Sequence, residues 1–165
     1  MTSASASRKT AAASNASACD STVVLEDQLC FSLYTSALAM MQVYKPMLER
    51  LGLTYPQFLV MTALWQADGA TVKQLAERIH QDSGSLTPLI KRLEAAGYLE
   101  RNRDTRDERN LCITLTPKGR ALQADGRAVS QQFAATCRLS SKEAIGMRDG
   151  LRSLESRLRD QRDGS

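Results

Sequence analysis

The chain has 165 residues, enough for one domain, and 42% of them are hydrophobic, so it can bury a core of its own. Aromatic residues make up 5% of the chain, with nine glycines and four prolines, a composition that favours helices over a many-stranded β-sandwich. No apolar run approaches the roughly 20 residues of a membrane-spanning helix, which excludes a membrane protein. The formal net charge of +4 permits a nucleic-acid partner without demonstrating one.

The cysteines and the histidine lack the spacing of a metal site. Cys19, Cys30, Cys112 and Cys137 lie far apart with no CxxC pair, and His80 is the only histidine. Structural zinc sites use closely spaced cysteines and histidines, so we expect no metal and no other cofactor. A chain that builds its own core does not need a disulfide framework, so we expect a reducing compartment, the cytoplasm.

The first 20 residues differ from the rest of the chain. Residues 1–20 are rich in serine, alanine and threonine and lack the apolar stretch of a secretory signal. We predict a disordered tail that carries Cys19, followed by a single domain at residues 21–165.

Two helices are predicted at the start of this domain. Apolar residues recur at helical spacing from Val23 to Gly52, which indicates a helix of about 28 residues with a kink expected at Pro46. The segment Thr54-Tyr55-Pro56-Gln57 then has the pattern of a capping box with proline in the first turn, and it opens a second helix.

A helix-turn-helix follows. Thr71-Val72-Lys73-Gln74 is another capping box and opens a short helix. Asp82-Ser83-Gly84-Ser85 is a second start signal, and the helix that it opens ends at Gly97. The connection between these two helices is short, which is typical of a helix-turn-helix.

Beyond Gly97 the apolar period drops to two. Residues 98–103 and 111–116 are predicted as two strands joined by the charged segment 104–110, which makes a β-hairpin. A short extra strand is expected near residues 70–72.

Two more helices are expected after the hairpin. Thr116-Pro117 caps a helix that runs towards Cys137, and Ser140-Ser141-Lys142-Glu143 opens the last one. The expected fold is therefore mainly α with a small β-hairpin wing. It is a winged helix-turn-helix at residues 54–116, set between dimerisation helices at residues 21–52 and 117–161.

The second helix of the helix-turn-helix can bind DNA. Its leucines must pack inward, which leaves five residues outward: Ser85, Thr87, Pro88, Lys91 and Arg92. Short polar side chains at a helix start can approach base edges in the major groove, and the two cations suit phosphates or a guanine.

The hairpin tip offers a second set of DNA contacts. Arg103, Arg106 and Arg109 could enter an A·T-rich minor groove, and Asp104 and Asp107 could hold these guanidinium groups in bidentate pairs. For the loop alone, an ordinary solvated hairpin is the better interpretation. Joined to the preceding helix, the loop is better explained as part of a winged DNA-binding unit.

The helices at the two ends carry more apolar surface than a small winged unit can cover. Pairing two chains through these ends would bury that surface and give a two-fold homodimer. Such a dimer places its two recognition helices about 34–36 Å apart on double-stranded DNA, which predicts an inverted-repeat operator.

Cys30 lies within the first helix. A cysteine on an apolar helix is usually an inert small hydrophobe, but Tyr34 at i+4 and Tyr44 at i+14 lie roughly on its face, and Tyr55 opens the next helix. Tyr44 is about 21 Å along the helix from Cys30, so only a partner's Tyr44, on an antiparallel first helix, could reach the thiol. Phenols that donate to the sulfur would favour the thiolate and its oxidation by an organic hydroperoxide. Alternatively, the tyrosines are interface residues only.

The segments Gln28-Leu29-Cys30-Phe31-Ser32-Leu33-Tyr34, Leu53–Phe58, Asp82–Leu93 and Asp107-Glu108-Arg109 carry a family resemblance. Together they resemble the organic-hydroperoxide-sensing branch of the MarR family, the OhrR repressors, over about residues 23 to 160. The recognition-helix and wing motifs are shared widely among MarR proteins, whereas Leu-Cys-Phe with its tyrosines is specific to the branch.

The resemblance implies a homodimeric repressor, usually of a thiol-dependent hydroperoxide reductase gene. The thiol matching Cys30 is oxidised to a sulfenate, and the tyrosines matching Tyr34, Tyr44 and Tyr55 surround it from the partner subunit. In one subgroup a second cysteine of the other chain, which Cys137 matches, then forms a disulfide with it; another subgroup uses a small external thiol.

Other interpretations stay open. Cys112 is expected to be structural, and Cys19 could compete as the resolving thiol. The chain could instead be a MarR-type repressor released by a non-covalent aromatic ligand, with Cys30 a bystander. A thiol peroxidase is less well supported because it leaves the helix-turn-helix unexplained, so we do not expect an enzyme.

Overall fold

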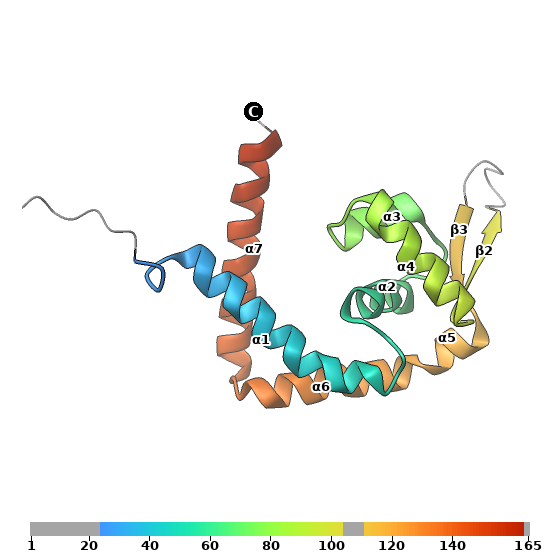
Figure 1. The fold of residues 1–165 in the computed structure, drawn as a ribbon, viewed down its shortest axis with the longest axis horizontal. Helices are drawn as coiled ribbons and strands as arrows, with labels where there is room; N and C mark the ends of the chain where they lie inside the picture. The colour runs from blue at the N-terminus through green and yellow to red at the C-terminus, as the bar shows by residue number, and fades with distance from the viewer. Residues whose placement is uncertain (1–23, 104–110, 164–165) are drawn as a thin grey trace, which may run out of the picture.

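The computed structural model describes residues 24–103 and 111–163, in which helices dominate and three short strands form a small sheet (Figure 1). The helices are α1 (Leu29–Glu49), α2 (Tyr55–Gln66), α3 (Val72–Arg78), α4 (Ser83–Ala95), α5 (Pro117–Ala121), α6 (Gln123–Cys137) and α7 (Ser141–Asp163), and the strands are β1 (Ala70–Thr71), β2 (Leu99–Arg103) and β3 (Leu111–Leu115). The predicted fold, mainly α with a hairpin after a helix-turn-helix, is confirmed. The predicted tail at residues 1–20 and the tip at residues 104–110 lie outside the described residues.

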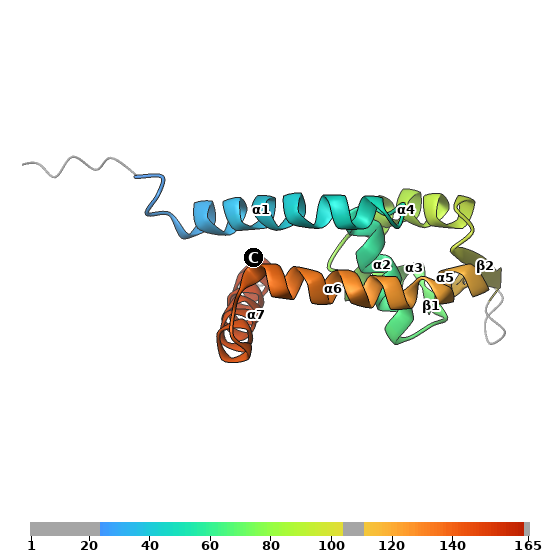
Figure 2. The same cartoon turned by 90° about the horizontal axis from the view of Figure 1, so that it is seen from below.

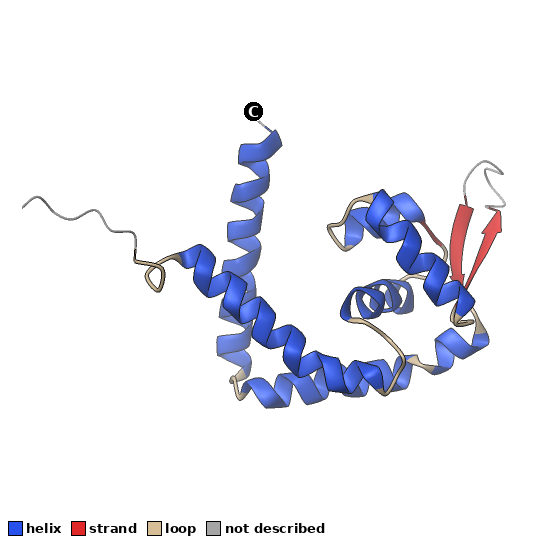
Figure 3. Ribbon diagram, in the orientation of Figure 1, coloured by secondary structure: helices blue, strands red, loops and turns tan. Residues whose placement is uncertain are grey.

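The strands and the terminal helices occupy opposite ends of the molecule. The strands stand beside α4 and α5 (Figure 3), whereas α1 and α6 lie one above the other as two layers and α7 turns sharply away from α6 (Figure 2). No helix in residues 24–103 or 111–163 is long and apolar enough to cross a membrane.

The capping boxes are formed as the sequence predicts. The Gln57 side chain accepts a hydrogen bond from the Thr54 N–H (2.8 Å), and the Gln74 side chain accepts one from the Thr71 N–H (2.9 Å). At the start of α4, Asp82 accepts from the Ser85 N–H (2.8 Å). These bonds satisfy N–H groups that the first turn of a helix leaves unpaired, so each of the three helices begins where its signal lies.

The first helix is shorter than predicted. It has 21 residues and begins at Leu29, because Gln28 is in an extended conformation. Val24 and Leu25 have apolar spacing but remain exposed, so burial does not stabilise a helix there. At the other end Gly52 adopts a left-handed conformation (φ 67°), as expected of a stop residue.

The helix predicted from Thr116 to Cys137 is divided in two. α5 ends and α6 begins at Leu122, whose ψ of −11° departs from that of a regular helix. The glycines on either side, Gly119 and Gly126, each lie so close to another element that a Cβ atom would overlap with it. Contacts to other elements therefore interrupt a pattern that is continuous in the sequence.

The hydrophobic core lies within the winged unit. The most deeply buried side chains come from the end of α1, from α2 to α4 and from the sheet, and include Leu48, Val60, Met61, Leu64, Leu75, Leu86, Leu93 and Ile113. In contrast, the start of α1 and most of α7 expose large apolar side chains, among them Leu29, Leu38, Ile145, Leu151 and Leu158. The described residues 24–103 and 111–163 leave this apolar surface uncovered.

The sheet is antiparallel with strand order β1-β3-β2. Leu99 pairs with Leu115 and Arg101 with Ile113, and the short strand expected near residues 70–72 is β1, which pairs Ala70 with Ile113. Ile113 and Leu115 are buried while Leu111 is exposed, so the inner face of β3 packs on the core.

Gly119→Ala tests the close approach between α5 and the hairpin. Its Cβ would overlap with the Tyr98 carbonyl oxygen, which accepts the Thr116 N–H, so we expect the free energy of unfolding to fall by about 1–3 kcal/mol in urea denaturation. Gly146→Ala on α7 meets nothing within 4 Å and should gain up to about 1 kcal/mol from helix propensity. Equal effects of the two variants would contradict this account.

Candidate nucleic-acid interface and thiol site

Helix α4, the second helix of the helix-turn-helix and the candidate recognition helix, presents one apolar and one polar face. Leu86, Ile90 and Leu93 are buried against the core. The opposite face exposes all five residues that the sequence analysis placed there: Ser85, Thr87, Pro88, Lys91 and Arg92.

Hydrogen bonds within the first turns of α4 orient its hydroxyl groups. The Ser85 hydroxyl donates to Asp82 (2.6 Å), and the Thr87 hydroxyl donates to the Ser83 carbonyl (2.9 Å). The bonds from Ser85 hold the pKa of Asp82 below its usual value. Because each hydroxyl donates its proton within the helix, it is left to accept hydrogen bonds, as the amino groups of adenine and cytosine require.

An ion pair joins the wing to the recognition helix. Arg101 of β2 contacts Glu94 of α4 (N···O 2.5 Å), and this contact lowers the pKa of the Glu94 carboxyl. No sequence signal indicates the pair, because it depends on how the chain turns at Gly97. Arg103 ends β2. The four tip residues, Asp104, Arg106, Asp107 and Arg109, lie outside the described residues, so their contacts with DNA stay predictions.

Aromatic side chains from three helices meet around Tyr44. Tyr44 of α1 lies 5.0 Å from Tyr55 of α2 and stacks on Phe133 of α6 at 4.3 Å, measured between ring centroids. Burial, then Tyr55 and the nearby Cys137, raise the pKa of Tyr44 to about 12, and burial raises the pKa of Tyr55. Both phenols are therefore protonated near neutral pH and can donate hydrogen bonds. The sequence analysis did not single out Phe133, whose role depends on packing between helices.

Cys30 lies far from these tyrosines within one chain. It is an exposed thiol at the start of α1, with Tyr34 one turn away and 62% exposed. The helix between Cys30 and Tyr44 is continuous, so the two residues are separated by about 21 Å. The structure thus brings together Tyr44, Tyr55 and Cys137, and it leaves Cys30 and Tyr34 outside this cluster.

A groove of about 710 Å³ runs between α1, α6 and α7 beside the aromatic cluster. Its walls are mostly apolar and include Met40, Phe133 and Leu151, together with Cys137. The Tyr55 hydroxyl lies 4.0 Å from the Met40 sulfur. An apolar molecule or side chain could enter this groove and reach the Cys137 thiol.

The remaining thiol and the histidine lie elsewhere. Cys112 is half-buried in β3 next to Gly69. His80 lies two residues beyond the end of α3 in a left-handed conformation, and its Nε2 lies 3.6 Å from Glu155 of α7. In the part of the chain that the structure describes, no three cysteine, histidine or acidic residues are grouped as metal ligands.

Comparison with known proteins agrees with this geometry. Residues 42–125 match the family model of the SarA/Rot transcriptional regulators. An organic hydroperoxide resistance transcriptional regulator of Bacillus subtilis is 46% identical over 99 residues, which cover 60% of this chain and 67% of the relative. The chain belongs to this family of MarR-like winged-helix regulators.

Solved MarR-like structures share the fold. Reduced AbfR bound to DNA has a TM-score of 0.70 and 33% identity, with 83% of this chain and 94% of AbfR covered; AbfR comes from Staphylococcus epidermidis and is also known in a disulfide form. CouR from Rhodococcus jostii bound to p-coumaroyl-CoA has a TM-score of 0.71 and 26% identity, with 81% and 95% covered. The MarR-like chain is a DNA-binding regulator and not an enzyme, so the thiol peroxidase interpretation is dropped.

The raised pKa of Tyr44 predicts a specific response to alkaline pH. An unfolded tyrosine ionises near pH 10 and Tyr44 near 12, so between these values the unfolded state loses a proton that the folded state keeps. The free energy of unfolding should fall across this window as the pH rises.

Absorbance titration should show the Tyr44 step near pH 12. This step should disappear in Tyr44→Phe and persist in Tyr34→Phe, which alters an exposed ring. A Tyr44→Phe protein that still shows the late step would assign it to another phenol.

Proposed function

We propose that the chain is a redox-sensing repressor, which acts in the cytoplasm as a homodimer. The reduced dimer binds an inverted-repeat operator and leaves it when an organic hydroperoxide oxidises Cys30. The Bacillus subtilis relative, an organic hydroperoxide resistance transcriptional regulator, supports an organic hydroperoxide as the signal. The reduced, DNA-bound and disulfide forms of AbfR support the redox control.

One observation carries this proposal: within the described residues, the cluster of Tyr44, Tyr55 and Cys137 does not include Cys30 of its own chain. Cys30 of the same chain is about 21 Å away along a continuous helix. A two-fold dimer that buries the exposed apolar faces of α1 and α7 can bring Cys30 of one subunit to the cluster of the other. Each dimer then has two sites, and each site uses residues from both chains.

The chemistry follows from these groups. Phenol donors beside the sulfur favour the thiolate of Cys30. The thiolate attacks the terminal oxygen of the hydroperoxide, the O–O bond breaks, and the remaining alkoxide takes a proton and leaves as the alcohol. The sulfenic acid that remains on Cys30 is attacked by the Cys137 thiol of the other chain, which forms an S–S bond and releases water.

The disulfide can affect DNA binding by changing the distance between the two recognition helices of the dimer. It requires the two Cα atoms to lie within about 7 Å, and if they start further apart the helices that carry them must shift. A difference of a few kcal/mol between two spacings of the recognition helices is enough to change occupancy of the operator. A reducing thiol system would reverse the change.

The groove supports a second candidate. Its apolar walls could hold an aromatic ligand, and CouR is a MarR-like structure with such a ligand, p-coumaroyl-CoA. In that case the ligand would release the repressor without any thiol chemistry, and alkylation of the thiols would leave the response intact.

Cys30→Ser tests the switch directly. We expect this variant to bind operator DNA as tightly as the wild type and to stay bound after addition of an organic hydroperoxide, in a band-shift titration. Release of Cys30→Ser at wild-type peroxide concentrations would contradict the thiol switch and favour the ligand-controlled repressor.

A mixture of two variants tests whether each site uses both chains. Cys30→Ser and Cys137→Ser, co-expressed and purified as a heterodimer, retain one Cys30 and one Cys137 on different chains. We expect a disulfide-linked dimer on a non-reducing gel after oxidation, and none from either variant alone. A linked dimer from Cys137→Ser alone would assign the resolving role to Cys19 or Cys112.

Lys91→Ala tests the phosphate contact of α4. Losing one exposed cation should weaken operator binding similarly for all sequences and reduce the salt dependence, as the slope of log K against log salt, by about 1. Lys73→Ala on α3 removes a lysine that is paired with Glu77 instead and should leave the slope unchanged. A loss confined to one base pair would show that Lys91 reads a guanine.

A further inference from the structure

The break at Leu122 separates α5 from α6, and the two helices contact different parts of the molecule. On one side, α5 is bonded to the end of the recognition helix: the Thr116 hydroxyl donates to the Gly97 carbonyl (2.7 Å), and the Lys118 ammonium donates to the Ala96 carbonyl (2.8 Å). On the other side, α6 carries Cys137 at its far end. Along the chain, a shift that begins at Cys137 crosses this break before it reaches α5 and its bonds to the end of α4.

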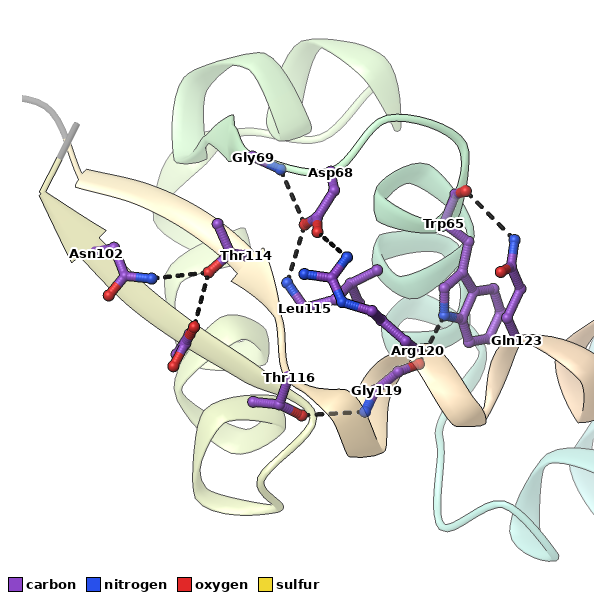
Figure 4. Close-up of polar contacts among 11 residues, drawn as sticks. Trp65, Asp68, Gly69, Asn102, Thr114, Leu115, Thr116, Gly119, Arg120 and Gln123 are labelled. Carbon is purple, nitrogen blue, oxygen red and sulfur yellow. Dashed lines mark hydrogen bonds and ion pairs between the residues drawn. The ribbon is translucent and has the colours of Figure 1, made fainter. Parts of the chain in front are cut away.

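Trp65 of α2 contacts both sides of the break (Figure 4). Its indole N–H donates to the Gly119 carbonyl of α5 (2.9 Å), and its own carbonyl accepts from the Gln123 side chain of α6 (3.4 Å). Its ring lies directly over Gly126 of α6, where a Cβ atom would overlap with the ring carbons. One residue, through its side chain and its backbone carbonyl, thus contacts both α5 and α6 where they meet.

Trp65 is also connected to the aromatic cluster. Its ring lies 6.1 Å from Phe58, Phe58 lies 6.0 Å from Tyr44, and Tyr44 stacks on Phe133. Phe133 is one helical turn from Cys137. Packed rings therefore run without interruption from the thiol site to the break.

Asp68, at the end of the same segment, holds the sheet and α5 together. Its carboxylate accepts the backbone N–H groups of Gly69 and Leu115 (2.9 Å each) and pairs with Arg120 (2.5 Å). The segment from Trp65 to Asp68 is thereby fixed to the winged unit, so movement of α6 relative to that unit changes the contact between Gly126 and the Trp65 ring.

We propose that Trp65 is the positioning residue that transmits oxidation at Cys137 to the recognition helix. This inference rests on the proposed redox switch. A disulfide that moves α6 displaces Gly126 beneath the indole ring, and the indole N–H carries that displacement to Gly119 and hence to α4. Because packed interiors rearrange in discrete steps rather than deforming gradually, a small shift of α6 selects a different angle of α5.

The test compares operator affinity before and after oxidation in two matched variants. Trp65→Phe keeps an aromatic ring but removes the bond to Gly119. Tyr98→Phe removes a comparable bond, from its hydroxyl to the Leu51 carbonyl (3.1 Å), that does not cross the break. We expect Trp65→Phe to form the Cys30–Cys137 disulfide at the wild-type rate. The factor by which oxidation lowers its operator affinity should be smaller than that of the wild type by about tenfold or more. Tyr98→Phe should behave as the wild type.

The outcomes separate this inference from the proposed function. If the wild type keeps its operator after oxidation, the redox switch itself fails. If the wild type and Trp65→Phe are released equally, only the role of Trp65 is overturned. A purely structural role would weaken the reduced and oxidised complexes of Trp65→Phe by the same factor, which would also overturn it.

A second measurement decides the matter if Trp65→Phe does not fold. Trp65 is the only tryptophan of the chain, so the fluorescence of the wild type reports on this one ring. We expect hydroperoxide to shift its emission in the wild type and not in Cys30→Ser. Release from DNA with no change in emission would overturn the inference.

Discussion

The length of one continuous helix is the constraint on which the proposed sensing chemistry depends. α1 holds Cys30 and Tyr44 about 21 Å apart, so one chain by itself cannot place Cys30 beside its own Tyr44. The same helix leaves its first half exposed and apolar while its last turns enter the core. Dimerisation and assembly of the thiol site are therefore the same event in the proposed mechanism, and a mutation that weakens one weakens the other.

The rest of the structure connects this end of the molecule to DNA through a few polar bonds at element ends. Thr116, Lys118 and Asp68 attach α5 to the recognition helix and the sheet, and Trp65 attaches α5 to α6. Each of these bonds reaches a backbone group at the end of a helix or strand, where hydrogen bonding is otherwise incomplete. The ends of helices and strands are therefore the points at which these elements are bonded to one another.

The helices and strands could be predicted from local sequence signals, whereas the features that depend on long-range contacts could not. Thr54, Thr71 and Asp82 begin their helices because each needs only a partner three residues away. The helix predicted from Thr116 to Cys137 is divided at Leu122, and α1 begins only at Leu29. Both features depend on what packs against the chain, and the periodicity of apolar residues carries no information about that packing. For the same reason the outward face of α4 was predicted, whereas the pair of Arg101 with Glu94 and the contact of Trp65 with Gly119 were not. The site residues Tyr44 and Tyr55 were singled out by their positions relative to Cys30 and then by the family resemblance, and their burial beside Phe133 came only from the structure.

The ion pair between Glu94 and Arg101 joins α4 to β2 of the wing, so the two elements form one DNA-binding unit. Asp68 adds a further restraint where β3 ends. In the proposed mode of binding, such a unit would leave the two grooves of the duplex together. Each half of a dimer would then engage or leave its stretch of DNA in a single step, so repression would end sharply and not fade.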